Sequence, residues 1–207
     1  MRLRLVEPED ADAIRSIYNH EVSSGTNTFD LVDRSVEEQR IWVDRHRGAH
    51  PAIVAVEGGA HPAIVAVEGG AYPAIVAEGA AGAPGAGVIP TAGPAQEQVL
   101  GFAVLSPFRD RAAYATTVED SVYVHRDHRG RGIGRALLDE LLSLAGAHGF
   151  HAVIARISSS NQPSIRLHHA CGFELVGIER EVGRKHGHWL DVVELQRMLR
   201  PGSRSEI

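Results

Sequence analysis

The sequence contains a single cysteine, Cys171, among its 207 residues. One cysteine excludes an internal disulfide and a metal site built from several cysteines. No apolar run approaches the roughly 18 residues that a membrane-spanning helix needs, and no basic segment followed by an apolar one opens the sequence. We therefore predict a reduced, cytoplasmic protein with no membrane partner.

A surplus of positive charge is also lacking, because the formal net charge is -5. A surface built to neutralise nucleic-acid phosphates needs clustered Lys and Arg. We therefore expect no nucleic-acid partner, and at most a local basic patch. The composition, 43% hydrophobic and 23% charged, is typical of a globular domain. We predict one domain over residues 1–200 and a tail at 201–207.

Apolar periodicity predicts strands and helices that alternate at first and give way to strands at the end of the chain. Helix-start signals occur near Pro8, Ser35, Gly132 and Pro163, with Ser35 and Glu38 at capping-box spacing. The predicted strands cover residues 2–5, 52–57, 99–108, 114–124, 151–157, 174–183 and 188–199. This order predicts a mixed sheet with helices on its faces.

A short apolar unit is repeated between the second helix and the next strand. "HPAIVAVEGGA" occurs twice in succession from His50, and a decayed third copy, "YPAIVAEGA", follows. Repeat architectures usually need periods of about 20 to 50 residues and at least three stacked units, so a solenoid is not expected. Residues 79–98 are rich in Gly, Ala and Pro, and we predict a mobile loop there.

The stretch "SVYVHRDHRGRGIGRALL" joins a strand to a helix through three glycines, Gly130, Gly132 and Gly134. Such a helix start points free N–H groups at an anion, and a pyrophosphate fits it. Arg129, Arg131 and Arg135 supply the local basic patch. The alternative is a tight strand-to-helix connection with no ligand. No Gly-Lys-Ser/Thr follows, so this is not a Walker sequence.

Arg129-x-x-Gly132-x-Gly134 after an apolar strand resembles the acetyl-CoA pyrophosphate loop of the GNAT superfamily of N-acetyltransferases. Within it, "IYNHEV", "TNTF", "TTVEDSVYVHRDHRGRGIG", "NQPSIRLHHACGF" and "RKHGHWLDV" resemble the phosphinothricin and methionine sulfoximine acetyltransferases. The resemblance covers about residues 2–57 and 98–198. It implies an α+β fold with three α/β/α layers around a mostly antiparallel sheet, and a homodimer that acetylates the amine of a small amino-acid-like substrate with acetyl-CoA.

The resemblance also implies how the repeated tract arose. The family has one strand where this chain has three candidates, so we interpret residues 49–98 as an insertion that holds a duplicated strand and a loop. We predict that the first copy, residues 52–57, occupies the sheet. The alternative is that the third copy does so.

The resemblance assigns the cofactor-binding residues. Main-chain groups of Val122, Tyr123 and Val124 would hold the pantetheine arm where the sheet splays, with an N–H near Val124 placed to stabilise charge on the thioester oxygen. Asn161 would hydrogen-bond the same arm. The pyrophosphate would lie against Arg129, Gly130, Arg131, Gly132, Ile133, Gly134 and Arg135.

The resemblance also assigns the catalytic residues. Glu119 matches the general base of the family, and strand alternation turns its neighbour Asp120 to the opposite face. His168 stands where many relatives have a tyrosine that protonates the CoA thiolate, so it is either the general acid or an orienting residue. The expected substrate-binding residues are Phe29, Tyr114, Lys185 and Trp189.

Three alternatives remain open at this point. A peptide or protein N-terminal acetyltransferase would share the cofactor loop, and a non-catalytic CoA-sensing or partner-binding module would share the fold. A metal site at His186 and His188 or at His125 and His128 is disfavoured, because no further ligands cluster with either pair. We predict no metal.

Overall fold

A computed structural model describes residues 1–46, 48–58 and 97–199. The chain divides into two compact units, one of residues 1–57 and 98–207 and the other of residues 58–97. Apart from Gly58 and Glu97, the second unit lies outside the described residues. The predicted surplus copies and the Gly-, Ala- and Pro-rich loop fall there, as does the predicted tail, so these remain predictions.

The first unit is built around one sheet of seven strands in the order β1-β2-β3-β4-β5-β7-β6. Every neighbouring pair is antiparallel except β4 and β5, which run parallel. The sheet is therefore mixed and mostly antiparallel, as predicted. The strands are β1 (Arg2–Leu5), β2 (Ala52–Glu57), β3 (Gln98–Pro107), β4 (Thr117–Val124), β5 (Ala152–Ser158), β6 (Glu174–Lys185) and β7 (His188–Met198).

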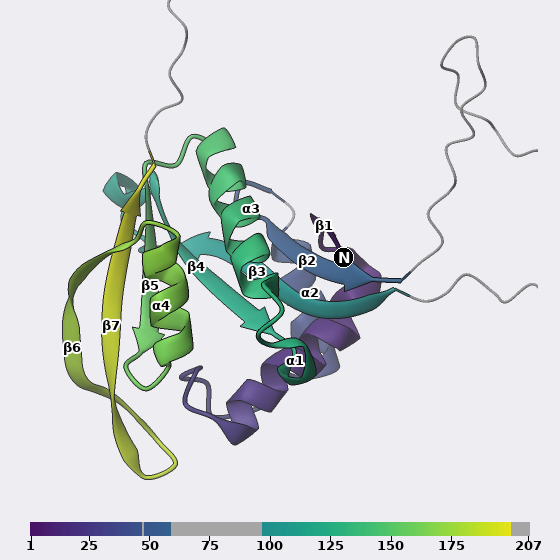
Figure 1. The fold of residues 1–207 in the computed structure, drawn as a ribbon, viewed down its shortest axis with the longest axis horizontal. Helices are drawn as coiled ribbons and strands as arrows, with labels where there is room; N and C mark the ends of the chain where they lie inside the picture. The colour runs from purple at the N-terminus through teal and green to yellow at the C-terminus, as the bar shows by residue number, and fades with distance from the viewer. Residues whose placement is uncertain (47, 59–96, 200–207) are drawn as a thin grey trace, which may run out of the picture. The chain divides into compact units, whose positions relative to one another are not determined.

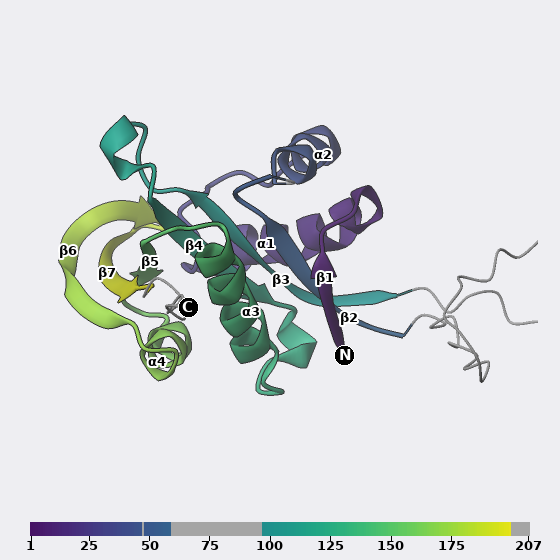
Figure 2. The ribbon, with the colours of Figure 1, turned by 90° about the horizontal axis from the view of Figure 1, so that it is seen from above.

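Four helices cover the two faces of this sheet, which gives the predicted three layers (Figures 1 and 2). Leu137, Leu138 and Leu141 of α3 are fully buried against β2, β3 and β4, whereas Ile14 of α1 belongs to a second core on the other face. Figure 2 shows α1 and α2 on one side of the strands and α3 and α4 on the other. The helices are α1 (Ala11–Ser24), α2 (Val36–Arg45), α3 (Ile133–Ala147) and α4 (Gln162–Ala170).

The first copy of the repeated unit forms β2 and lies between β1 and β3. Five of its residues, 52–56, are buried, because helices cover the sheet on both faces. This burial explains why the unit "AIVAV" is apolar at every position rather than at alternate ones. The prediction that the first copy occupies the sheet is confirmed.

Local signals set several element boundaries as predicted. Ser35 accepts a hydrogen bond from the Glu38 N–H at 3.2 Å, and the Glu38 carboxylate accepts one from the Ser35 N–H at 2.8 Å, which completes the capping box of α2. One boundary was wrong. Tyr114 ends a 3-10 turn (Ala112–Tyr114) rather than starting a strand, and β4 begins at Thr117. The Tyr114 ring packs edge-on against Phe108, which favours the compact turn.

The two central parallel strands separate soon after they meet. β4 and β5 pair only from Thr117 with Ala152 to Glu119 with Ile154. Beyond that point β4 stays paired with β3 up to Val124, and β5 stays paired with β7 up to Ser158. The sheet is therefore open between the second half of β4 and the second half of β5, as the predicted splay requires.

Candidate active site

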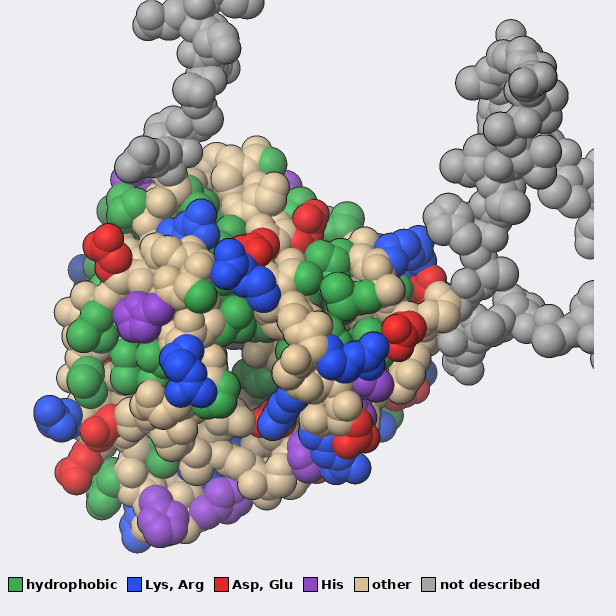
Figure 3. All heavy atoms as spheres, viewed as in Figure 1, with side chains coloured by type: hydrophobic (Ala, Val, Ile, Leu, Met, Phe, Trp, Pro, Cys, Tyr) green, Lys and Arg blue, Asp and Glu red, His purple; other side chains and the backbone are tan. Residues whose placement is uncertain are grey.

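A cavity of about 360 Å³ lies where β4 and β5 separate. Figure 3 shows the surface hollowed between α4 and the start of α3, with Lys and Arg side chains around the hollow. Of the residues predicted to hold the cofactor, all but Arg131 line this cavity. The structure thus brings together residues that stand up to 39 positions apart in the sequence, from Val122 to Asn161.

The edge of β4 that faces the cavity offers main-chain groups. The His125 N–H donates to the Leu100 carbonyl of β3 at 2.9 Å. Because peptide groups alternate in direction along a strand, those of Tyr123 also face β3, and those of Val122 and Val124 face the gap toward β5. The Tyr123 ring packs away from the gap, against Tyr18 and Phe102.

Two glycines give the turn before α3 its shape. Gly130 and Gly132 have positive φ angles of 76° and 79°, a conformation that residues with a Cβ rarely adopt. Gly132 is the N-cap of α3, and Ile133 anchors the first turn in the core at 2% exposure. The first N–H groups of α3 have no partner within the helix, and they lie at the cavity. This end of the helix can bind an anion.

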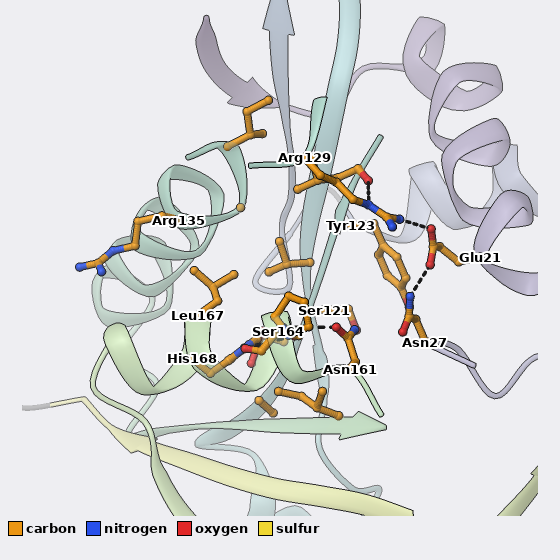
Figure 4. A pocket seen from close by; sticks show the side chains of 18 of the residues that line it. Glu21, Asn27, Ser121, Tyr123, Arg129, Arg135, Asn161, Ser164, Leu167 and His168 are labelled. Carbon is orange, nitrogen blue, oxygen red and sulfur yellow. Dashed lines mark hydrogen bonds and ion pairs between the residues drawn. The ribbon is translucent and has the colours of Figure 1, made fainter. Parts of the chain in front are cut away.

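The three arginines around this turn are each held by a carboxylate. Arg129 forms an ion pair with Glu21 and donates to the Val124 carbonyl at 3.3 Å. Arg131 lies 3.4 Å from Glu57, and Arg135 lies 2.6 Å from Asp139. Figure 4 shows Arg135 turned away from the cavity. The charges of these arginines are therefore paired with carboxylates, and the ion pairs help to hold the turn in place.

Glu21 of α1 lines the cavity and was not among the residues predicted from the sequence. Its carboxylate is buried in the cavity wall, where one oxygen pairs with Arg129 and the other accepts a hydrogen bond from Asn27 at 2.6 Å (Figure 4). Glu21 thus connects the turn before α3 to the segment that follows α1. A carboxylate on the apolar stripe of Ile17 and Tyr18 was the available signal.

Asp120 and His168 form a buried pair in the same cavity. His168 Nε2 lies 3.0 Å from Asp120 Oδ2, and both side chains are nearly inaccessible, at 3% and 1%. His168 Nδ1 donates to the Ser164 carbonyl at 2.8 Å, so both ring nitrogens are engaged. The second oxygen of Asp120, Oδ1, has no hydrogen-bond partner among the described residues. This pair was not predicted, because Asp120 was expected only to point away from Glu119.

The pKa of His168 follows from this contact. Burial alone lowers the pKa of the imidazole, but the hydrogen bond and charge of Asp120, together with the Ser164 carbonyl, outweigh it and raise the pKa above its ordinary value. His168 therefore has both ring nitrogens committed to hydrogen bonds, and its surroundings favour the protonated form of the ring. Asn161, the N-cap of α4, lies in the same wall and accepts a hydrogen bond from the Ser164 N–H at 3.3 Å (Figure 4).

Glu119 and Asp120 point to opposite faces of β4, as alternation predicts. Val118 and Val122, on the face of Asp120, pack into the core with α3, whereas Tyr123, on the face of Glu119, packs against α1. Glu119 is half-buried and is not among the described residues that line the cavity. Burial raises its pKa, Arg156 opposes this rise, and the charges of Asp120, Glu194 and Glu179 add to it.

Three of the four expected substrate-binding residues lie on or against the β6–β7 hairpin. Phe29 covers Gly183, where a Cβ would come within 2.1 Å of its ring. Trp189 is 60% exposed and stands opposite Arg184 in the strand register. Lys185 is buried at 3%, and its Nζ donates to the Thr28 carbonyl at 2.9 Å. None of the three lines the described part of the cavity.

Tyr114, the fourth of these residues, lies elsewhere. Its turn precedes β4, and Figure 1 shows that turn far from the β6–β7 connection. The structure therefore does not bring all four residues together. Within the described residues no group of three or more His, Cys, Asp or Glu side chains could hold a metal ion, and no helix is long and apolar enough to cross a membrane.

Comparisons with known proteins agree with this geometry. The sequence profile of the acetyltransferase (GNAT) family matches residues 74–173. The chain is 35% identical to phosphinothricin N-acetyltransferase of Streptomyces coelicolor over 92% of each chain. It is 33% identical to the L-methionine sulfoximine/L-methionine sulfone acetyltransferase of Pseudomonas paraeruginosa, over 93% of this chain and 91% of that protein.

Solved structures show the same fold. A phosphinothricin acetyltransferase from Sinorhizobium meliloti in complex with acetyl-CoA superposes with a TM-score of 0.74 at 34% identity, over 96% of this chain and 88% of that one. A ribosomal-protein-alanine N-acetyltransferase from Brucella melitensis superposes with a TM-score of 0.74 at 30% identity, over 96% and 100%. The chain belongs to the GNAT family of acetyltransferases, and within it to the group of the phosphinothricin and methionine sulfoximine N-acetyltransferases.

Proposed function

We propose that this protein transfers the acetyl group of acetyl-CoA to the primary amine of a small amino-acid-like substrate, by direct attack in a ternary complex. The observation that carries the proposal is the cavity where the open edge of β4 meets the head of α3. The names of the relatives support the substrate class, and acetyl-CoA is bound in the Sinorhizobium structure.

The chain would hold acetyl-CoA mainly with its backbone. Peptide groups of Val122 and Val124 suit the amide-containing pantetheine arm, and the N–H groups that open α3 suit the pyrophosphate. Asn161 lies in the wall beside them. Acetyl-CoA supplies the thioester carbonyl, and the Val124 N–H would stabilise the negative charge that develops on its oxygen.

Glu119 would accept the proton of the substrate ammonium, directly or through one water, because an alkyl ammonium stays protonated at neutral pH. The nitrogen then bonds to the acetyl carbon, the carbon–sulfur bond breaks, and the second proton that the nitrogen loses passes through water to the CoA thiolate. Both N–H groups of His168 are committed to Asp120 and Ser164. Of its two predicted roles we therefore propose the orienting one.

One change tests this mechanism. Glu119→Gln keeps the shape but cannot accept a proton, so kcat should fall by about 10²- to 10⁴-fold while the Kd for acetyl-CoA stays unchanged. The matched control is Glu140→Gln, an exposed site on α3, which should leave kcat alone. Because burial raises the Glu119 pKa, the acid limb of kcat/KM in the wild type should lie above the ordinary glutamate range. Wild-type turnover by Glu119→Gln would remove Glu119 as the base.

A second candidate function has one observation in its favour, the close superposition on the Brucella ribosomal-protein-alanine N-acetyltransferase. A thiol-release assay across phosphinothricin, methionine sulfoximine and short peptides with N-terminal alanine separates the two. If only the peptides are acetylated, the protein is a peptide N-acetyltransferase and the proposed amino-acid substrate class is wrong. Binding of acetyl-CoA without turnover on any of these amines would favour a non-catalytic module.

We further propose a cytoplasmic homodimer with no nucleic-acid, membrane or metal partner. The edge strand β6 exposes Leu175, Val176, Ile178 and Val182 at 48–57%, an apolar surface of the kind that a second copy covers. The molar mass in solution tests the homodimer, since a monomer at micromolar concentration would contradict it.

A further inference from the structure

Lys185 is one of the residues expected to bind substrate, and a cation there would suit an acidic group of the substrate. In the structure the Lys185 ammonium is buried and already donates to the carbonyl of Thr28, with the carbonyl of Glu21 at 3.5 Å. Burial also lowers its pKa. An acidic group on a substrate must therefore find a different positive charge.

Arg156 of β5 is such a charge. The burial pattern of β5 has a single exposed position among six buried ones, and that position is Arg156. Its neighbours Ala155 and Ile157 point into the core below α3, so Arg156 points to the opposite face. Arg156 lines the cavity just past the last β4–β5 pair, Glu119 with Ile154. Arg156 thus lies on the same face of the sheet as Glu119, two residues beyond the residue of β5 that pairs with Glu119.

Three glutamates share this face with Arg156, and each comes from a different strand. Glu119 of β4 pairs with Ile154, two residues before Arg156. Glu194 of β7 stands directly opposite Arg156, and Glu179 of β6 reaches it at 2.5 Å. One guanidinium among three carboxylates suits a ligand that carries both signs of charge. A zwitterionic amino acid is such a ligand, with its ammonium toward the glutamates and its carboxylate toward the arginine.

The existing ion pair does not block this role. Arg156 and Glu179 are 39% and 37% exposed, and an exposed ion pair contributes little to stability. A guanidinium carries five N–H donors in a planar fork, so it can hold a second carboxylate by two parallel hydrogen bonds while Glu179 keeps its own. Glu179 would then fix the direction of the fork.

We propose that Arg156 is a specificity-determining residue that binds the α-carboxylate of the amino-acid substrate and thereby turns the substrate amine toward Glu119. This inference rests on the proposed function and deepens it, since it restricts the substrates to amines that carry an adjacent acid group.

The test compares two substrates in three proteins. The substrates are L-methionine sulfoximine and its analogue without the α-carboxylate, and the proteins are the wild type, Arg156→Met and Arg156→Lys. For the amino acid, Arg156→Met should lower kcat/KM by about 10- to 100-fold, mainly through KM, as expected for the loss of a charged hydrogen bond. For the analogue the same change should have little effect. For the amino acid, kcat/KM of Arg156→Lys should lie between those of the wild type and Arg156→Met, because lysine keeps the charge but lacks the planar set of N–H donors.

Assays at a pH well above the Glu119 pKa keep the base ionised in every variant. Arg180→Met is the matched control, since Arg180 is exposed and lies 3.9 Å from Asp191 on the β6–β7 hairpin. Arg180→Met should leave kcat/KM unchanged for both substrates. Equal losses on both substrates, or no loss on the amino acid, would overturn the role of Arg156. Wild-type activity on neither substrate would instead contradict the proposed function itself.

Discussion

At the scale of single residues, the buried pair of Asp120 and His168 makes a pH-dependent contribution to stability. The pKa of His168 is raised in the folded protein, where Asp120 holds the imidazolium. A raised pKa stabilises the fold fully below the unfolded value of about 6.5, and this stabilisation is lost as pH rises through the folded value. The protein should therefore lose part of its stability as the pH moves from neutral to alkaline.

Asp120→Asn tests this contribution. It leaves a buried imidazole without its anion, so burial should push the His168 pKa below its ordinary value, and unfolding should become easier by about 3 kcal/mol near pH 6. The deficit should shrink as the pH rises through the folded-state pKa of His168, because above it the histidine is neutral in both proteins. Urea unfolding at several pH values and the NMR titration of His168 measure both effects. Asp139→Asn, which removes an exposed pair with Arg135, should cost less than about 1 kcal/mol at any pH.

The face of the sheet on which each strand residue lies could be predicted from the sequence, but the side chain that it contacts there could not. Alternation along β4 correctly turned Asp120 away from Glu119. Its contact with His168, 48 positions later, depends on how α4 packs on the sheet, which no local pattern encodes. Lys185 shows the same limit. Its charge suggested a ligand, whereas the carbonyl groups that bind it come from a distant segment.

At the scale of elements, the head of α3 depends on a left-handed residue. Gly132→Ala should lower stability by about 1–3 kcal/mol, because φ at this position is 79°, and should weaken acetyl-CoA binding as the first N–H groups lose their direction. Calorimetric Kd values and Tm report both losses. Gly146→Ala is the matched control in the same helix, where the new methyl group meets open space. It should be neutral or stabilising, by up to about 1 kcal/mol. An unchanged Kd in Gly132→Ala would separate this turn from cofactor binding.

Elements with a strong period could be predicted, and those with a mixed signal could not. α3 carries leucines at helical spacing, and its burial follows that stripe. Tyr114 precedes an apolar strand and has a high strand propensity, yet its ring packs on Phe108 and the chain turns there. The place of β2 was predictable only because the first copy follows α2 directly, and the three copies could not be told apart by composition.

At the scale of the whole molecule, the second and third copies of the repeated unit should be dispensable. β2 ends at Glu57 and β3 begins at Gln98, and the two strands pair in antiparallel fashion up to that point. Antiparallel strands need only a short connection. Deleting residues 60–81 should therefore leave Tm within a few degrees of the wild type and leave the KM for acetyl-CoA unchanged. Loss of folding would show that the surplus copies are structural and would contradict the duplication hypothesis.

The two ends of this connection must be kept in such a deletion, because both contact the turn before α3. Glu57 lies 3.4 Å from Arg131, and the Gln98 side chain lies 3.3 Å from His128 Nε2. A longer deletion that removed either residue should raise the KM for acetyl-CoA through the turn rather than through folding. The same kinetic assay with Tm as a second readout distinguishes these causes.

The gap between β4 and β5 has a consequence for which acyl donors the enzyme can use. If the pantetheine arm lies along the peptide groups of Val122 and Val124 that face this gap, the sheet recognises a portion that acetyl, propionyl and longer thioesters have in common. Such recognition does not depend on the length of the acyl chain. Any preference for a two-carbon group must then arise from the side chains around the acyl group, which in the proposed mechanism include Glu119 and Arg156.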